Sequence, residues 1–201
     1  KLCQERKVDI VFIPERKVMY SVLHSTLIEE ENLSKGLCGS SRPTHFQGVT
    51  TVCAKLFNIC KPNIVVLGQK DAQQVVVLKR MIKDLNFPIE VIVGDIFREN
   101  DGLAMSSRNS YLSSEQREDA LLLNRSLLAG RDLQSRGICN IDQIKEEVIA
   151  TLRQGKSIML DYVEVVDRET MEPMKEIKPN QTMIVLAAWI DKIRLIDNLN
   201  L

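Results

Sequence analysis

The chain has 201 residues, of which 44% are hydrophobic and 27% charged, and its 27 Lys and Arg balance its 27 Asp and Glu. This composition excludes disordered, collagen-like and coiled-coil chains, and it is sufficient for one large or two small domains. A net charge of zero gives no signal for polyanion binding, and no apolar run is long enough to span a bilayer. We therefore expect neither nucleic acid nor a membrane as a partner.

The five cysteines form no C-x-x-C pair and have no histidine at metal-ligand spacing. An odd number of unpaired thiols is typical of a protein kept reduced in the cytoplasm. The charged start has no secretory cleavage pattern, so no signal peptide is expected. These observations predict a cytoplasmic protein with no metal site of its own.

The N-terminal part begins with a charged stub and an apolar run, residues 8–14 (VDIVFIP), which predicts a buried strand closed by proline. The stub is typical of the end of a helix that starts before Lys1, so we expect the chain to lack its beginning. Residues 36–48 are rich in glycine and serine and predict an irregular loop.

Helices and strands then alternate. Apolar residues recur at helical spacing over 49–60, strands are predicted over 63–67 and 89–93, and a helix between them is expected to run from a capping Asp71 to about Leu85. Short connections between strand, helix and strand predict a parallel sheet with right-handed crossovers.

The C-terminal part changes in character after residue 96. Ser113 and Gln116 form a capping box that opens a helix to about Ser135, and Asn140 with Gln143 repeats the device for a helix ending at Gly155. Strands follow over 160–166, 183–188 and 193–197, the last two joined as a hairpin. This order predicts a small α+β domain over 97–201, after an α/β domain over 1–96.

The first candidate site is the strand-to-helix turn at residues 68–71 (GQKD). Ligands of open α/β sheets bind beyond the carboxyl ends of the strands, where Gly68 permits close approach and Lys70 supplies a mobile charge for phosphate. Asp71 can accept from ribose hydroxyls, and Gln74 lies one turn further on the same face. The alternative is a capped helix with a solvated lysine, since the turn is neither G-x-G-x-x-G nor a Walker loop.

A second cluster is the segment 102–109 (GLAMSSRN), where two hydroxyls beside a guanidinium can donate to phosphate oxygens. A polar loop before a helix is the alternative. Arg42 and His45 lie in the first loop, where a structural role is the commoner one for a lone histidine. His24 is expected at the surface, and Trp189 is expected to serve packing.

Together these segments resemble the pantothenate synthetase family. The resemblance is carried by residues 41–49 (SRPTHFQGV), 67–74 (LGQKDAQQ), 101–109 (DGLAMSSRN), 186–189 (LAAW) and 194–198 (RLIDN), and it covers essentially the whole chain in order.

The resemblance implies a Rossmann-like nucleotidyl-transferase domain of the HUP type, followed by a smaller C-terminal domain that closes over the nucleotide. It implies that ATP adenylates pantoate, that β-alanine then displaces AMP to give pantothenate, and that the enzyme is a homodimer. Mg²⁺ would be held mainly by the ATP phosphates.

The resemblance also implies roles for particular residues. Gly68, Gln69, Lys70 and Asp71 would contact ATP, and Gln74 would hold pantoate. The main chain at Phe97 and Met105 would border adenine, Ser106, Ser107 and Arg108 would hold the phosphates, and Arg42 and His45 would lie near the reacting carboxyl group. The catalytic set would be Lys70, Ser106, Ser107 and Arg108.

The sequence departs from the family pattern in three places. It contains no H-x-G-H sequence, the loop that contacts ATP phosphates in the family, so the fragment alone is expected to be inactive. Gln69 stands where many relatives carry an acid, and Phe97 where a smaller aliphatic residue is usual. Two other functions stay open: an adenylate-forming nucleotidyltransferase for a different acid, and a non-catalytic remnant that binds nucleotide or dimerises.

Overall fold

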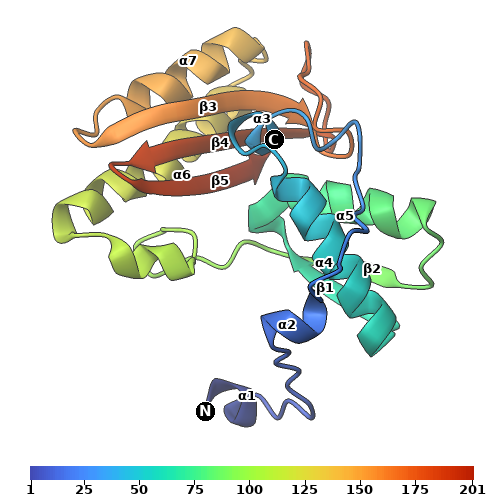
Figure 1. Cartoon of the computed structure of the whole chain (residues 1–201). Helices are drawn as coiled ribbons and strands as arrows, with labels where there is room; N and C mark the ends of the chain where they lie inside the picture. The colour runs from blue at the N-terminus through green and yellow to red at the C-terminus, as the bar shows by residue number, and fades with distance from the viewer.

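The computed structural model describes all 201 residues and places them around two separate sheets (Figure 1). The first sheet pairs β1 (Ile64–Gly68) with β2 (Glu90–Gly94) in parallel, with Val66 opposite Ile92. Helix α5 (Ala72–Asp84) makes the crossover between them, and α4 (His45–Cys60) lies beside it. The predicted strand–helix–strand unit is therefore confirmed.

One face of this parallel sheet is covered by helices and the other is open. Val65, Leu67 and Val91 pack against the buried side chains of α4 and α5. On the opposite face, 51% of Ile64, 68% of Val66 and 43% of Ile92 are exposed. Parallel strands are normally buried on both faces, so this open face is unusual.

The strand predicted over residues 8–14 is wrong. The segment lies between two single-turn helices, α1 (Leu2–Glu5) and α2 (Arg16–Met19), and pairs with no strand. Ile10 and Ile13 are 82% and 83% exposed, and Figure 1 shows this part of the chain extending away from the body of the molecule. An apolar run becomes a strand only where a neighbour pairs its backbone, and residues 8–14 do not lie against either strand of the first sheet.

Three further predictions on the first 96 residues need correction. The loop predicted over 36–48 contains a short helix, α3 (Cys38–Ser41), and α4 begins at His45 rather than at residue 49. Asp71 occupies the N-cap position of α5, but its side chain makes no capping hydrogen bond. Its carboxylate is therefore free of the helix end and lies beside a cavity.

The second sheet is antiparallel, in the order β3 (Ile158–Asp167), β4 (Thr182–Ile190), β5 (Ile193–Asn200). The predicted hairpin joins β4 to β5 through two residues, of which Asp191 has a φ of 51°. Helix α6 (Ser114–Ser135) begins at the predicted capping box, in which Ser113 and Gln116 bond each other's backbone amides. Helix α7 (Ile141–Leu152) has the predicted Asn140 as its N-cap, which accepts from the Gln143 amide, and it ends three residues before Gly155.

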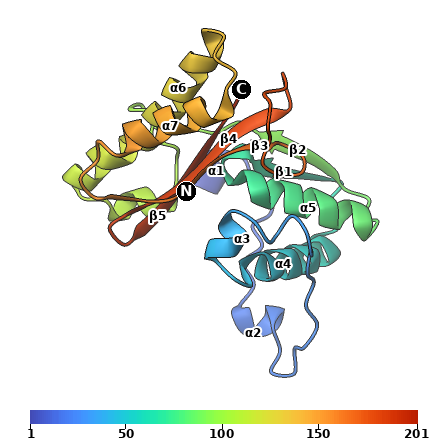
Figure 2. The same cartoon turned by 90° about the horizontal axis from the view of Figure 1, so that it is seen from above.

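The two faces of the antiparallel sheet have different partners (Figure 2). Helices α6 and α7 cover one face and build the largest core with it, around Leu123, Leu127 and Ile144. On the other face, Ala72 and Val76 of α5 pack against Val185 of β4. The N-terminal end of α5 therefore lies where the two sheets meet.

Three smaller points complete the fold. All five cysteines are free thiols, and no helix is long and apolar enough to cross a membrane. His24, expected at the surface, is half-buried against the ring of Tyr20, with its Nε2 atom buried.

Candidate functional site

A cavity of about 180 Å³ opens where the first turns of α4 and α5 face β3 and β5. Most of its polar lining comes from the ends of elements, where backbone and side chains point away from the core. The polar and charged lining residues are Arg42, His45, Lys70, Asp71, Gln73, Gln74, Arg108, Tyr162, Arg194, Asp197 and Asn198.

The structure brings six of the predicted site residues to this one cavity: Arg42, His45, Lys70, Asp71, Gln74 and Arg108. They come from three segments far apart in sequence. Gly68 and Gln69 precede Lys70 directly, in the strand end and the 3-10 turn η1 (Gln69–Asp71), but do not line the cavity. A Cβ at Gly68 would meet no atom within 4 Å, so the backbone there is open to close approach.

Phe97 and Met105 lie outside this cavity. They line a separate shallow hollow with Arg98, Glu99 and Arg117 among others, and their side chains are 73% and 52% exposed. The Met105 amide donates to the Phe97 carbonyl at 2.8 Å, so these two main-chain groups pair with each other. Only the Phe97 amide and the Met105 carbonyl are left for a base.

The phosphate side of the predicted site is basic. None of the chain's ion pairs involves Lys70 or Arg108, so both cations are available to an anion. Ser106 precedes the turn η2 (Ser107–Tyr111), and its hydroxyl accepts from the Arg108 amide at 3.3 Å, which leaves the hydroxyl proton free to donate. Unpaired cations beside backbone amides favour phosphate.

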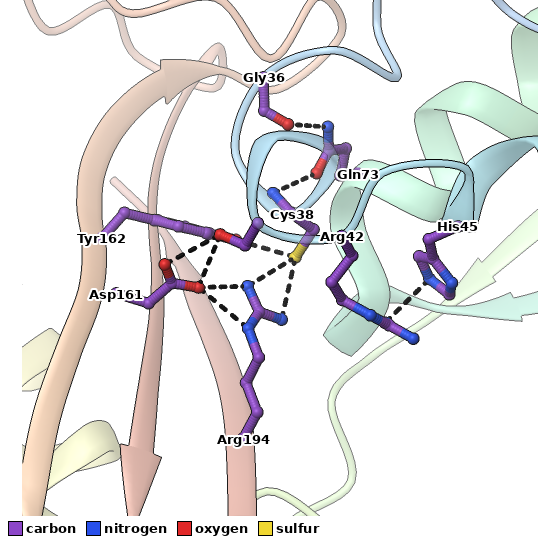
Figure 3. A network of polar contacts seen from close by, with 9 residues as sticks. Gly36, Cys38, Arg42, His45, Gln73, Asp161, Tyr162 and Arg194 are labelled. Atoms are coloured by element: carbon purple, nitrogen blue, oxygen red, sulfur yellow. Dashed lines mark hydrogen bonds and ion pairs between the residues drawn. The ribbon is translucent and has the colours of Figure 1, made fainter.

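Arg42 and His45 contact each other at the N-terminal end of α4 (Figure 3). The Arg42 guanidinium lies 3.0 Å from His45 Nε2, and because a guanidinium only donates, Nε2 accepts and the proton sits on Nδ1. Burial lowers the pKa of His45 from its ordinary value of 6.5, and the charges of Arg42, Arg108 and Arg194 lower it further. His45 is therefore neutral at pH 7 and adds no charge to the basic cavity.

A partly buried network of polar side chains contacts the segment before Arg42 (Figure 3). Arg194 of β5 donates to Asp161 of β3 at 2.7 and 2.9 Å, and Asp161 also accepts from the Ser41 hydroxyl at 2.9 Å. Arg194 reaches Cys38 Sγ at 3.5 Å, and the Tyr162 hydroxyl lies 3.1 Å from the same sulfur. Burial raises the pKa of Tyr162, which stays a protonated phenol.

Gln73, the residue before Gln74, also contacts this segment through its side chain. The buried Gln73 side chain accepts from the Cys38 amide at 3.0 Å and donates to the carbonyls of Leu33 and Gly36 at 2.8 Å. Sequence analysis assigned no role to Gln73, Asp161, Tyr162 or Arg194. Their partners are up to 156 residues away, and no local pattern reports such pairings.

Two adjacent residues of β5 were also missed. Asp197 accepts from both ends of the Arg98 guanidinium, at 2.7 and 3.0 Å, and Asn198 donates to the carbonyls of Gln69 and Lys70 at 3.0 Å. The sequence offered only two consecutive polar residues within a predicted strand, whereas the structure shows that both are only 3% exposed. Buried polar side chains have partners, so their burial implies a tertiary contact.

This fold and site define an α/β protein that presents a basic cavity at a strand-to-helix turn, suited to an anionic substrate. Comparison with known proteins specifies it further. A model of the family Pantoate-beta-alanine ligase matches residues 1–200. The chain is 52% identical over 197 residues to the pantothenate synthetase of Pseudothermotoga lettingae, covering 98% of this chain and 70% of that protein. It is 50% identical over 198 residues to that of Thermotoga petrophila, with the same coverages.

Solved structures agree. A pantothenate synthetase from Thermus thermophilus superimposes with a TM-score of 0.96 at 39% identity, covering 99% of this chain and 72% of that one. A pantoate-beta-alanine ligase from Francisella tularensis, described as complexed with beta-gamma ATP and beta-alanine, gives a TM-score of 0.77 at 32% identity, with 99% and 67% covered. The chain belongs to the pantoate-beta-alanine ligase family, as the resemblance of its motifs predicted, and spans about 70% of the length of its relatives.

Proposed function

We propose that this protein, in its complete form, condenses pantoate with β-alanine in two steps. A pantoate carboxylate oxygen attacks the α-phosphorus of ATP, the bond from that phosphorus to the bridging oxygen breaks, and pyrophosphate leaves. The β-alanine amine then attacks the carbonyl carbon of pantoyl adenylate, and AMP leaves as pantothenate forms. The observation that carries this proposal is the meeting of Arg42, His45, Lys70, Asp71, Gln74 and Arg108 at one cavity.

The charges at the cavity suit the first step. Adenylation builds negative charge on the α-phosphate and pyrophosphate, and preorganised cations stabilise such charge as it develops. Lys70 and Arg108 carry unpaired charges, and Ser106 and Ser107 add hydroxyl donors beside Arg108. Asp71 would take the ribose hydroxyls, Gly68 and Gln69 the neighbouring backbone contacts, and Phe97 and Met105 the edge of adenine.

The acid substrate would contact Gln74, Arg42 and His45 in the same cavity. Gln74 offers an amide that donates and accepts, which suits pantoate with its hydroxyls and carboxylate. Arg42 and the neutral His45 lie on the same side of the cavity as the α3 loop and would orient the reacting carboxylate.

Mg²⁺ would be held mainly by ATP phosphate oxygens, and the donors present are compatible with that. Of the two carboxylates that line the cavity, Asp197 is paired with Arg98, which leaves Asp71 alone. When bound, the ion would neutralise phosphate charge; hard oxygen ligands and retained waters are its usual preference.

We also propose that the two parts of the chain have different roles. Residues 1–96 would bind nucleotide and pantoate, and residues 97–201 would form a lid over them, a division supported by the separate sheets on either side of residue 96. The functional unit would be a homodimer, which sedimentation equilibrium would test. A polypeptide of residues 1–201 alone, without an H-x-G-H sequence, would give no measurable turnover.

The test is pyrophosphate release by the full-length enzyme with ATP and different acids. We expect release that depends on pantoate and not on related 2-hydroxy acids, followed by AMP release that depends on β-alanine. Release with another acid in place of pantoate would favour a different adenylate-forming enzyme. Nucleotide binding without any release would favour a non-catalytic remnant.

A further inference from the structure

The turn that carries Lys70 is held from the other sheet by one side chain. Asn198 Nδ2 on β5 donates to two successive carbonyls of the turn, those of Gln69 and Lys70, at 3.0 Å each. The Gln69 side-chain amide returns a bond to Asn198 Oδ1 at 3.3 Å. All the polar atoms of the Asn198 amide group are thereby directed at η1.

Asn198 is itself rigidly placed. It is 3% exposed, and its Cα lies opposite Val185 in the β4–β5 ladder. Its backbone amide donates to the Asp197 carboxylate at 2.8 Å. The two oxygens of that carboxylate also accept from the two terminal nitrogens of Arg98. A buried strand residue fixed by a ladder and a neighbouring ion pair provides a stable reference for a turn.

The turn lies between Gly68, which is paired with Gly94 at the end of β1, and the first residue of α5. Gly68 is exposed and has open space around it, and the Asp71 side chain makes no capping bond to α5. The carbonyls of Gln69 and Lys70 fix where the Lys70 side chain leaves the backbone and where Asp71 follows.

We propose that Asn198 is a positioning residue for the adenylation step, holding the 69–71 turn so that Lys70 and Asp71 meet the nucleotide in productive geometry. This inference rests on the proposed function, because it acts through the roles assigned to Lys70 and Asp71. Displacements of about 1 Å at such groups cost up to about 10² in rate. The C-terminal sheet thus contributes to the chemistry through the backbone of the turn.

The experiment compares Asn198→Ala and Asn198→Asp with a matched control on the same strand, Asn200→Ala, in the full-length enzyme. Asn200 is exposed, two residues further along β5. We expect the pantoate-dependent rate of pyrophosphate release to fall by about 10-fold to 10²-fold in both Asn198 variants. We expect KM for ATP to change by less than about threefold, because the geometry matters most as charge moves onto the leaving group. The control should match the wild type.

A double-mutant cycle with Lys70→Ala separates positioning from a general loss of structure. If Asn198 acts through Lys70 and Asp71, Asn198→Ala should slow the Lys70→Ala enzyme by clearly less than it slows the wild type, because only the contribution of Asp71 is left to lose. An equal loss in both backgrounds would overturn the proposal, as would a wild-type rate in both Asn198 variants. A fall in melting temperature with a rate that recovers on cooling would assign Asn198 to stability instead and also overturn it.

The same cycle distinguishes this inference from the function it rests on. If Lys70→Ala leaves the rate unchanged, the proposed role of the turn is wrong. If Lys70→Ala slows release and the Asn198 variants do not, only the positioning role fails.

Discussion

Lys70 is a cation in the cavity with no ion-pair partner, at the turn where a phosphate would approach the helix end. Lys70→Ala should lower the adenylation rate by about 10²–10³, the size found for single transition-state donors, with little change in stability. Single-turnover pyrophosphate release measures this. Lys83→Ala, an exposed lysine at the far end of α5, is the control. A loss below tenfold would remove Lys70 from the chemistry.

Gln74 and Gln73 are adjacent but have different surroundings. Both residues line the cavity, but the Gln73 side chain is bonded to three backbone groups of residues 33–38, and the Gln74 side chain makes no such bonds. Gln74→Ala should weaken pantoate binding by about 1–3 kcal/mol, the usual cost of leaving polar groups unpaired, while ATP affinity stays within about twofold. Gln74→Glu should be worse, because it sets two carboxylates together.

Calorimetric titration of both substrates tests the Gln74 prediction. Gln73→Ala provides the contrast, since it should lower the melting temperature by removing three hydrogen bonds. Equal losses for ATP and pantoate in Gln74→Ala would place that residue in a nucleotide-binding or folding role.

His45 makes stability depend on pH. Burial, followed by the charges of Arg42, Arg108 and Arg194, lowers its pKa below 6.5 in the folded protein, so the unfolded chain binds the proton more tightly. The resulting stability is complete above pH 6.5 and is lost as pH falls through the folded-state pKa. His45→Gln should therefore flatten part of the decline in melting temperature as the pH falls from about 6.5 to about 5. An identical pH profile in wild type and variant would contradict this assignment.

At the scale of elements, the 33–44 loop depends on a glycine. A Cβ at Gly39 would lie 1.7 Å from the Ser34 carbonyl oxygen, whereas one at Gly36 would meet nothing within 4 Å. Gly39→Ala must move backbone and should destabilise the protein by about 1–3 kcal/mol, as overpacking does. It should also raise KM for pantoate, because Arg42 follows directly on α3.

Gly36→Ala, in the same loop, is the matched control and should behave as wild type. Chemical denaturation and steady-state kinetics on both variants give the comparison. Equal effects of the two substitutions would show that backbone crowding at Gly39 does not govern the loop.

Local signals predicted the helices best. The Ser113–Gln116 box placed the start of α6 correctly, because a cap depends on residues within one turn. The strand predicted over 8–14 failed because strand formation needs a partner distant in sequence, and apolar composition does not report one. The same reason hid the contacts of Arg194 with Cys38 and of Asn198 with Gln69, which join residues more than 120 positions apart.

At the scale of the whole molecule, the site exists only where the two sheets meet. Asn198 bonds the 69–71 turn, and Asp197 bonds Arg98. Asp161, paired with Arg194, accepts from Ser41 at the end of α3. Three segments of the chain are therefore attached to the C-terminal sheet by side-chain hydrogen bonds. The 68–71 turn could be predicted as a candidate site from the sequence, because ligands of open α/β sheets bind beyond the carboxyl ends of the strands. The attachment of these segments to β5 required the structure.

The open face of the parallel sheet supports a last prediction, made for a polypeptide of residues 1–201. Ile64, Val66 and Ile92 present adjacent apolar side chains there, and exposed apolar patches on flat strands bind apolar dyes and self-associate. Val66→Lys points a charge outward from the middle of this face without touching the core, so it should roughly halve dye fluorescence and shift the protein toward monomer in sedimentation. Leu128→Lys, at a 37% exposed position on α6, is the matched control and should change neither reading. Equal reductions in both variants would mean that added charge alone raises solubility. Unchanged dye binding in Val66→Lys would instead place the dye-binding surface in the exposed apolar run around Ile10 and Ile13.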